Sequence, residues 1–97
     1  MNYFAVHYLY AGDSEQIITL RPEHRAWLGG LRDENILIGS GPYTDGFGGA
    51  LIIIRLPEPA TVADAEALMD QDPFQQEGAL AGREIREWNP VLNVFAE

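Results

Sequence analysis

Two short segments of the chain are apolar on both of the faces that a β-strand would present. Residues 3–10 (YFAVHYLY) and 49–56 (GALIIIRL) are rich in aromatic and β-branched residues, which are typical of strands. Side chains alternate between the two faces of a strand. In the first segment one face carries Phe4, Val6 and Tyr8 and the other carries Tyr3, Ala5 and Leu9; in the second, Ile52 and Ile54 alternate with Leu51 and Ile53. Strands of this kind are normally buried on both faces, so the sheet needs cover from two sides.

The remaining segments complete two similar halves. A helix is predicted from Pro22, which suits the first helical position, to about Asn35, which suits the left-handed position after a helix end. A second helix, with Thr61 as its N-cap, is expected over residues 62–71. The polar stretch 11–16 precedes the first helix, and further strands are expected at 36–41 and 80–88. The order strand–helix–strand–strand–helix–strand predicts an α+β fold: a ferredoxin-like split βαβ with a four-stranded antiparallel sheet and two helices on one face.

A second copy of the chain is the simplest cover for the other face of this sheet. Two helices cover only one face of four strands, and both faces are apolar. A chain of 97 residues buries only somewhat over ~60% of its unfolded surface, so its own core is modest. We therefore expect residues 1–97 to form a single domain that assembles as a homodimer.

Composition excludes several classes of protein. Fifteen acidic residues against six basic ones give a net charge of −9, which disfavours nucleic acid and anionic membranes as partners. The chain has no cysteine, which excludes disulfides, thiolate chemistry and cysteine metal sites. Its first residues lack the basic region of a secretory signal, and no apolar run approaches the ~20 residues that span a bilayer. These features predict a small cytoplasmic protein.

One of the two histidines lies where a helix normally places its core residues. His24, Leu28 and Leu31 are spaced i, i+4 and i+7 and share one face, while Arg25 and Arg32 are expected to point away from it. An imidazole at such a position is either a satisfied core residue or a general acid/base suited to neutral pH. Both interpretations remain open from the spacing alone.

Asp72 is the natural companion of this histidine. It precedes Pro73 in the pattern of a helix N-cap, which uses one carboxylate oxygen and leaves the other able to orient an imidazole. If the two side chains meet, Asp72 would hold the imidazole tautomer of His24. A metal held by His7, His24 and a carboxylate is a weaker alternative, because the histidines lack the usual ligand spacings.

The glycine-rich stretches are weaker signals. The segment GSGPYTDG follows a strand but enters a turn, so it lacks the context of a dinucleotide-binding loop, and Ser40 lies in no nucleophile motif. Gly39 and Gly41 are interpreted as sites of tight backbone packing. Gly29 and Gly30 are unfavourable inside a helix by roughly 1 kcal/mol each, which predicts the close approach of another backbone there.

Several segments together resemble the YciI-like (YCII-related) proteins. They are YFAVHYLY, RPEHRAWL, SGPYTDGFGGALII, DQDPFQQEG and REIREWNPVL, which follow one another in the family's order over nearly the whole chain. The resemblance implies a fold of the dimeric α/β-barrel superfamily and an acid/base pair that falls on His24 and Asp72. It also implies a pocket between helix and sheet. The residues expected to line that pocket are Ser40, Gly41, Pro42 and Phe74.

These observations predict a cofactor-independent enzyme that uses a His–Asp acid/base pair on a small oxygenated or cyclic organic molecule. Lyase, isomerase and hydrolase reactions all fit such a pair, and neither a cofactor nor a metal is expected. The alternative is a noncatalytic small-molecule-binding or assembly module of the same fold, in which the His–Asp pair is structural.

Overall fold

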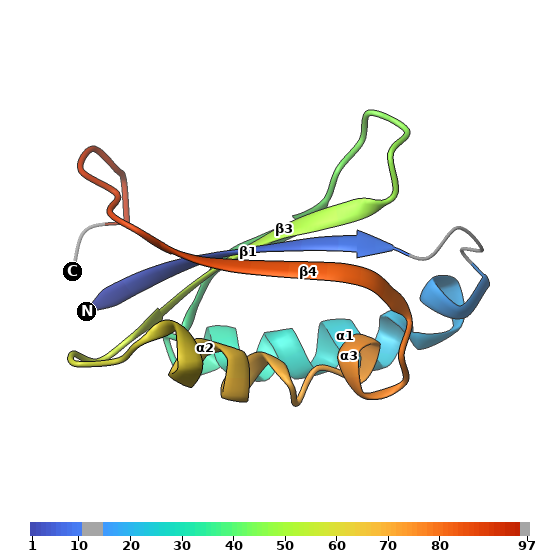
Figure 1. Ribbon diagram of the computed structural model, residues 1–97, viewed down its shortest axis with the longest axis horizontal. Helices are drawn as coiled ribbons and strands as arrows, with labels where there is room; N and C mark the ends of the chain where they lie inside the picture. Colours follow the sequence, from blue (N-terminus) through green and yellow to red (C-terminus); the bar gives the residue numbers. More distant parts are fainter. Residues whose placement is uncertain (11–14, 96–97) are drawn as a thin grey trace.

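Four antiparallel strands form one sheet in the order β2-β3-β1-β4. A computed structural model describes residues 1–10 and 15–95, so residues 11–14 of the expected polar stretch lie outside the described residues. The strands are β1 (Asn2–Tyr10), β2 (Leu37–Pro42), β3 (Gly49–Leu56) and β4 (Leu80–Trp88), and the helices are α1 (Glu15–Asp33), α2 (Val62–Met69) and α3 (Pro73–Gln76). All three helices lie on one side of the sheet (Figure 1). The predicted ferredoxin-like α+β fold is therefore confirmed.

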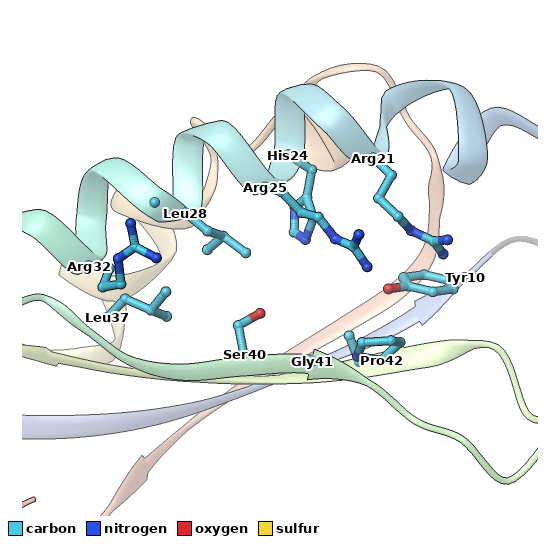
Figure 2. Close-up of a pocket in the computed structure, with 12 residues that line it drawn as sticks. Tyr10, Arg21, His24, Arg25, Leu28, Arg32, Leu37, Ser40, Gly41 and Pro42 are labelled. Carbon is cyan, nitrogen blue, oxygen red and sulfur yellow. The ribbon is translucent and has the colours of Figure 1, made fainter.

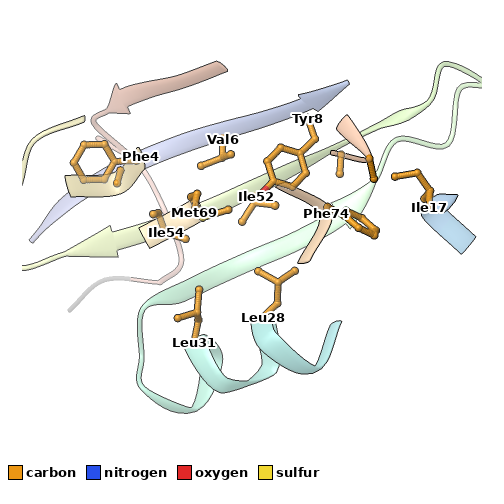
Figure 3. Close-up of a cluster of buried hydrophobic side chains, with 13 residues drawn as sticks. Phe4, Val6, Tyr8, Ile17, Leu28, Leu31, Ile52, Ile54, Met69 and Phe74 are labelled. Atoms are coloured by element: carbon orange, nitrogen blue, oxygen red, sulfur yellow. The ribbon is translucent and has the colours of Figure 1, made fainter. Parts of the chain in front are cut away.

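The core lies between the sheet and the helices. Val6 on β1 is paired with Ile52 on β3, and both side chains are fully buried on the face that the helices cover. Helix α1 contributes Ile17, Leu28 and Leu31 to the same core (Figure 3). The predicted inward stripe of α1 is confirmed, because the buried residues of this helix include His24, Leu28 and Leu31.

The start of α1 differs from the prediction. The helix begins at Glu15, so Pro22 lies inside it and not at its first position. The early turns are held by tertiary contacts: Ile17 is buried in the core, and the Gln16 side-chain amide donates to the Glu77 backbone carbonyl at 2.9 Å. Such packing overrides the unfavourable effect of an interior proline, roughly 3 kcal/mol.

The end of α1 follows the prediction. Asn35 adopts a left-handed conformation with φ of 62°. Its N–H donates to the Arg32 carbonyl, and the next N–H, of Ile36, donates to the Leu31 carbonyl at 2.9 Å. This is the Schellman pattern, which satisfies the last carbonyls of the helix and turns the chain into β2.

The second half carries a shorter, interrupted helical connection. Helix α2 starts after Thr61, whose N–H donates to the Asp64 carboxylate at 2.8 Å, as in a capping box. It ends at Met69, two residues short of the predicted end at residue 71, and α3 begins after Asp72. The interruption places Asp72 between two helical segments that lie under the sheet.

Four glycines do not have the packing role predicted for them. These are Gly29, Gly30, Gly39 and Gly41. A side-chain carbon built at any of them would meet no atom nearer than 4.0 Å, because none faces another backbone closely. Close approach occurs instead at Gly49, where such a carbon would overlap the Tyr8 carbonyl oxygen of neighbouring β1.

No helix among the described residues covers the second face of the sheet. The side chains on this face include Ala5, Leu51 and Ile53, which are only partly buried, and Leu9, which is 57% exposed. The described residues also contain no helix long and apolar enough to cross a membrane.

Candidate active site

The structure brings His24 and Asp72 into direct contact. His24 projects from the middle of α1, and Asp72 comes from the interruption between α2 and α3. The His24 Nδ1 atom lies 2.8 Å from Asp72 Oδ1 and 2.9 Å from Oδ2. Asp72 is fully buried and His24 is only 6% exposed. A hydrogen bond so well shielded from water is electrostatically stronger than one at the surface.

The local sequence explains why the carboxylate points inward. Asp72 is the N-cap of α3 and Pro73 occupies the first turn, so the Phe74 N–H donates to Asp72 Oδ1 at 3.0 Å. The Tyr8 hydroxyl donates to Oδ2 at 2.7 Å. Each carboxylate oxygen therefore accepts from His24 and from one further group. The prediction had one oxygen capping the helix and the other free for the imidazole, so the observed carboxylate accepts more hydrogen bonds than predicted.

Tyr8 is a site residue that the sequence analysis placed only in the core. Burial, reinforced by the Asp72 carboxylate, raises the pKa of Tyr8 well above its ordinary value near 10. The phenol therefore keeps its proton and remains a donor to Asp72. The sequence did contain a signal for this role. Tyr8 follows Val6 on the inward face of β1, and a buried tyrosine hydroxyl needs a hydrogen-bond partner.

The hydrogen bonds define the state of the imidazole. An ionised carboxylate can only accept, so Nδ1 of His24 carries the hydrogen and Nε2 is left for other chemistry. No described residue forms a hydrogen bond with Nε2. The Phe74 ring stacks on the imidazole with centroids 3.9 Å apart and planes 8° apart. Phe74 was expected to line the pocket; instead it is fully buried behind the imidazole and fixes the plane of the ring.

A cavity of about 260 Å³ lies beside His24, between α1 and β2. Ser40, Gly41 and Pro42 line its β2 side, as expected for the pocket (Figure 2). Ser40 and Pro42 point toward the helices because they pair with Ile52 and Ala50, whose side chains are buried on that face. The cavity therefore places His24 opposite a serine hydroxyl.

Three arginines also line this cavity. Arg25 and Arg32 lie outside the buried stripe of α1, as predicted, but they line the cavity beside it, and Arg21 joins them. They lie on the flank of α1 next to its buried stripe, and the cavity opens along that flank. Tyr10 lines the same cavity; burial raises the pKa of its hydroxyl, and the nearby Arg21 and Arg25 oppose that rise. The signal in the sequence was the spacing of Arg21, Arg25, Leu28 and Arg32 along one side of a helix.

The residues that the structure describes contain no group of three or more histidine and carboxylate side chains placed to hold a metal. His7 alternates with the buried Val6 and Tyr8, so it lies on the opposite face of the sheet from His24. There its Nδ1 is 2.9 Å from the Tyr43 hydroxyl. The alternative of a metal shared by both histidines is therefore wrong.

Comparison with known protein families identifies residues 1–89 as a YCII-related domain. This chain belongs to the YCII-related family. The matched segment of the YCII-related domain contains every residue of the site described above. No curated protein sequence matches the chain significantly.

Solved structures show the same fold at low sequence identity. The 5-chloro-2-hydroxyhydroquinone dehydrochlorinase TftG of Burkholderia phenoliruptrix AC1100, in complex with 2,5-dihydroxybenzoquinone, is 19% identical with a TM-score of 0.75, over 90% of this chain and 93% of that chain. The protein Atu4242 of Agrobacterium tumefaciens is 14% identical with a TM-score of 0.58, over 93% of each chain. An antibiotic biosynthesis monooxygenase is 11% identical with a TM-score of 0.57, over 92% of this chain and 97% of that chain. The YCII-related domain thus shares its fold with proteins of different named activities, so its own activity must be argued from its site.

Proposed function

We propose that this YCII-related protein is a cofactor-independent enzyme in which His24 and Asp72 perform acid/base chemistry on a small oxygenated or cyclic organic molecule. The observation that carries the proposal is the buried Asp72 carboxylate, which holds His24 by Nδ1 and leaves Nε2 free beside a cavity. An imidazole supported in this way is a general base whose protonated form is stabilised by the carboxylate.

The chemistry follows from this arrangement. Nε2 of His24 takes a proton from a carbon or oxygen of the bound molecule, and Asp72 stabilises the imidazolium that forms. The imidazolium then returns the proton to the leaving group or to another atom of the substrate. Ser40, on the opposite wall, donates a hydrogen bond to a substrate oxygen. Elimination and isomerisation use this sequence; in hydrolysis His24 takes the proton from a water molecule that attacks the substrate and returns it to the leaving group. The named activity of TftG on a chlorinated hydroxyhydroquinone supports the class of substrate.

A substrate screen tests the proposal. Phenols, lactones and halogenated hydroquinones are incubated with wild type, His24→Ala, Asp72→Asn and the control His7→Ala, and product formation is followed by absorbance and mass spectrometry. We expect turnover of at least one compound, with rates about 10²–10⁴-fold lower in the two site variants and unchanged in the control. Equal rates in wild type and His24→Ala would overturn the role of His24.

The second candidate is a noncatalytic binding module, favoured by the near-complete burial of His24 and its stacking on Phe74. In such a module the cavity binds a molecule and releases it unchanged. Absence of turnover together with a large loss of stability in His24→Ala would select this candidate.

We further propose that the chain acts as a homodimer through the uncovered face of the sheet. This face has an apolar hollow lined by Ala5, Leu51, Ile53 and Trp88, among other residues. Light scattering at micromolar concentration should give about twice the chain mass of 10.8 kDa. Ile53→Glu should break the dimer, and the control Ala26→Glu, on the exposed side of α1, should leave it intact. A wild-type mass of one chain would refute the dimer.

A further inference from the structure

The cavity beside His24 gathers positive charge in a protein whose net charge is −9. The chain has no lysine and six arginines, and three of these, Arg21, Arg25 and Arg32, line this one cavity. None of the aspartates or glutamates in the described part of the chain lines it. Half of the chain's permanent cations therefore meet at a single cavity of about 260 Å³.

The placement of these arginines on α1 directs them toward one ligand. Arg21 and Arg25 are one helical turn apart, and Arg32 follows two turns later on the same side. Figure 2 shows the Arg21 and Arg25 side chains extending from the helix toward the sheet, with the Arg21 guanidinium near the Tyr10 ring, while the Arg32 side chain lies along the helix. Two cations thus lie on the Tyr10 side of the imidazole, at one end of the cavity.

The guanidinium groups are not used by the fold. The guanidinium groups of Arg21 and Arg25 form no hydrogen bond or ion pair with any residue that the structure describes. The Arg32 guanidinium pairs with Asp33 at 3.4 Å, and both of these side chains are more than 70% exposed (73% and 74%). Like charges on successive turns of a helix repel each other. An anion bound between them would remove this repulsion.

We propose that the cavity recognises its ligand by a carboxylate group, which Arg21 and Arg25 hold while the rest of the molecule lies against Leu28 and Leu37, next to Nε2 of His24. This inference rests on the proposed function, because it identifies the substrate class of the same site as small organic acids. A guanidinium matches the geometry of a carboxylate and binds it through two parallel hydrogen bonds. The cavity volume is below the ~300–1,000 Å³ of most ligand pockets, so the acid must be small.

Binding of matched probes tests the proposal without any assay of turnover. Three carboxylates, benzoate, 4-hydroxybenzoate and cinnamate, are each compared with the corresponding neutral amide by isothermal titration calorimetry and NMR titration. We expect at least one carboxylate to bind about tenfold or more tightly than its amide, and to shift amide signals of α1 and β2. Its affinity should fall as ionic strength rises. If none of the three carboxylates binds in preference to its amide, the proposal is wrong.

Arginine variants locate the carboxylate. Arg21→Gln and Arg25→Gln should each weaken carboxylate binding by about tenfold or more, while their melting temperatures stay at or above that of wild type because repulsion is relieved. The matched control is Arg86→Gln, on the exposed opposite face of the sheet, and it should bind as wild type does. Unchanged affinity in both cavity variants would overturn the proposal.

His24→Ala separates this inference from the catalytic proposal. If the carboxylate still binds His24→Ala and wild type turns over no substrate, the charge recognition stands and only the catalytic proposal fails. If wild type shows turnover that depends on His24 but no preference for carboxylates, the enzyme proposal stands and this inference fails.

Discussion

The two halves of this domain repeat the same strand–helix–strand plan but connect their strands differently. In the first half α1 runs without interruption for 19 residues, through Pro22 and two glycines. In the second half the connection is divided into α2, of eight residues, and α3, of four. The continuous helix supplies the imidazole and the cavity arginines, and the interruption supplies the carboxylate. A straight second helix would keep its backbone groups paired along its length and could not present Asp72 as an N-cap pointing at His24.

Removing Asp72 should have the largest effect, because it breaks the junction of the second half. Asp72→Ala leaves the Phe74 N–H, the Tyr8 hydroxyl and His24 Nδ1 without their acceptor, and α3 without its cap. We expect a loss of about 3–5 kcal/mol in the free energy of unfolding, measured by urea denaturation. Asp33→Ala is the control: Asp33 and its partner Arg32 are both more than 70% exposed (74% and 73%), so its removal should change stability by about 1 kcal/mol or less.

Tyr8→Phe tests the hydrogen bond between Tyr8 on β1 and Asp72 at the interruption between α2 and α3. The variant loses the 2.7 Å hydrogen bond to Asp72, and we expect a loss of about 0.5–1.5 kcal/mol at neutral pH. The pKa of Tyr8 is raised in the folded state, so its stabilising contribution is complete below the unfolded value near 10 and is lost as pH rises above it. Above pH 10 the stability of wild type should therefore fall more steeply than that of Tyr8→Phe, while exposed Tyr43→Phe should follow wild type.

His24→Ala tests how much the imidazole on α1 contributes to the stability of the fold. Asp72 keeps the Phe74 N–H and the Tyr8 hydroxyl as donors after this change, and the vacated space joins a cavity that water can enter. We expect a change within about 1 kcal/mol by thermal or urea unfolding, because sites built for function are commonly not optimal for stability. Leu31→Ala, two turns away in the core and outside the cavity lining, should lose about 2–5 kcal/mol. A loss as large as that of Leu31→Ala would favour a structural histidine.

The smallest change in stability should come from replacing Gly29 or Gly30, which lie inside α1 and contact no other backbone closely. Gly30→Ala introduces a methyl group that meets no atom within 4 Å, so it should stabilise α1 by about 0.5–1 kcal/mol. Gly29 lines the cavity, and Gly29→Ala should stabilise the helix similarly while narrowing the ligand space. Thermal unfolding measures the stabilisation, and carboxylate titration measures whether only Gly29→Ala weakens binding.

Local patterns in the sequence predicted the features that depend on a few neighbouring residues. The left-handed Asn35, the N-cap at Asp72 and the inward stripe of His24, Leu28 and Leu31 all follow from backbone chemistry or periodicity. The element order was sufficient to predict the sheet topology, because few arrangements of two βαβ halves exist.

Features that depend on distant contacts could not be predicted in this way. The first turns of α1 form because Ile17 and Gln16 find partners near α3, not because residues 15–21 favour a helix strongly. Periodicity identifies which residues share the buried stripe, but it does not show that a cavity opens beside that stripe. For this reason the sequence placed Arg25 and Arg32 off the buried stripe, correctly, but did not predict that they line a cavity. Tyr8 was assigned to the core for its ring, and its hydroxyl partner lies 64 positions away in sequence.

Helix α1 carries its buried residues and its cavity arginines on two adjacent sides, and this separation has an evolutionary consequence. The residues that contact the core and Asp72 and those that carry charge into the cavity occupy adjacent but separate positions on one rigid element. If the cavity recognises its ligand by charge, as proposed, exchanging Arg21, Arg25 and Arg32 would alter the charge of the accepted ligand without changing His24 or its contacts with Asp72. A lineage with this architecture could then diversify its ligands by substitutions on a single helix while the His24–Asp72 pair is inherited unchanged.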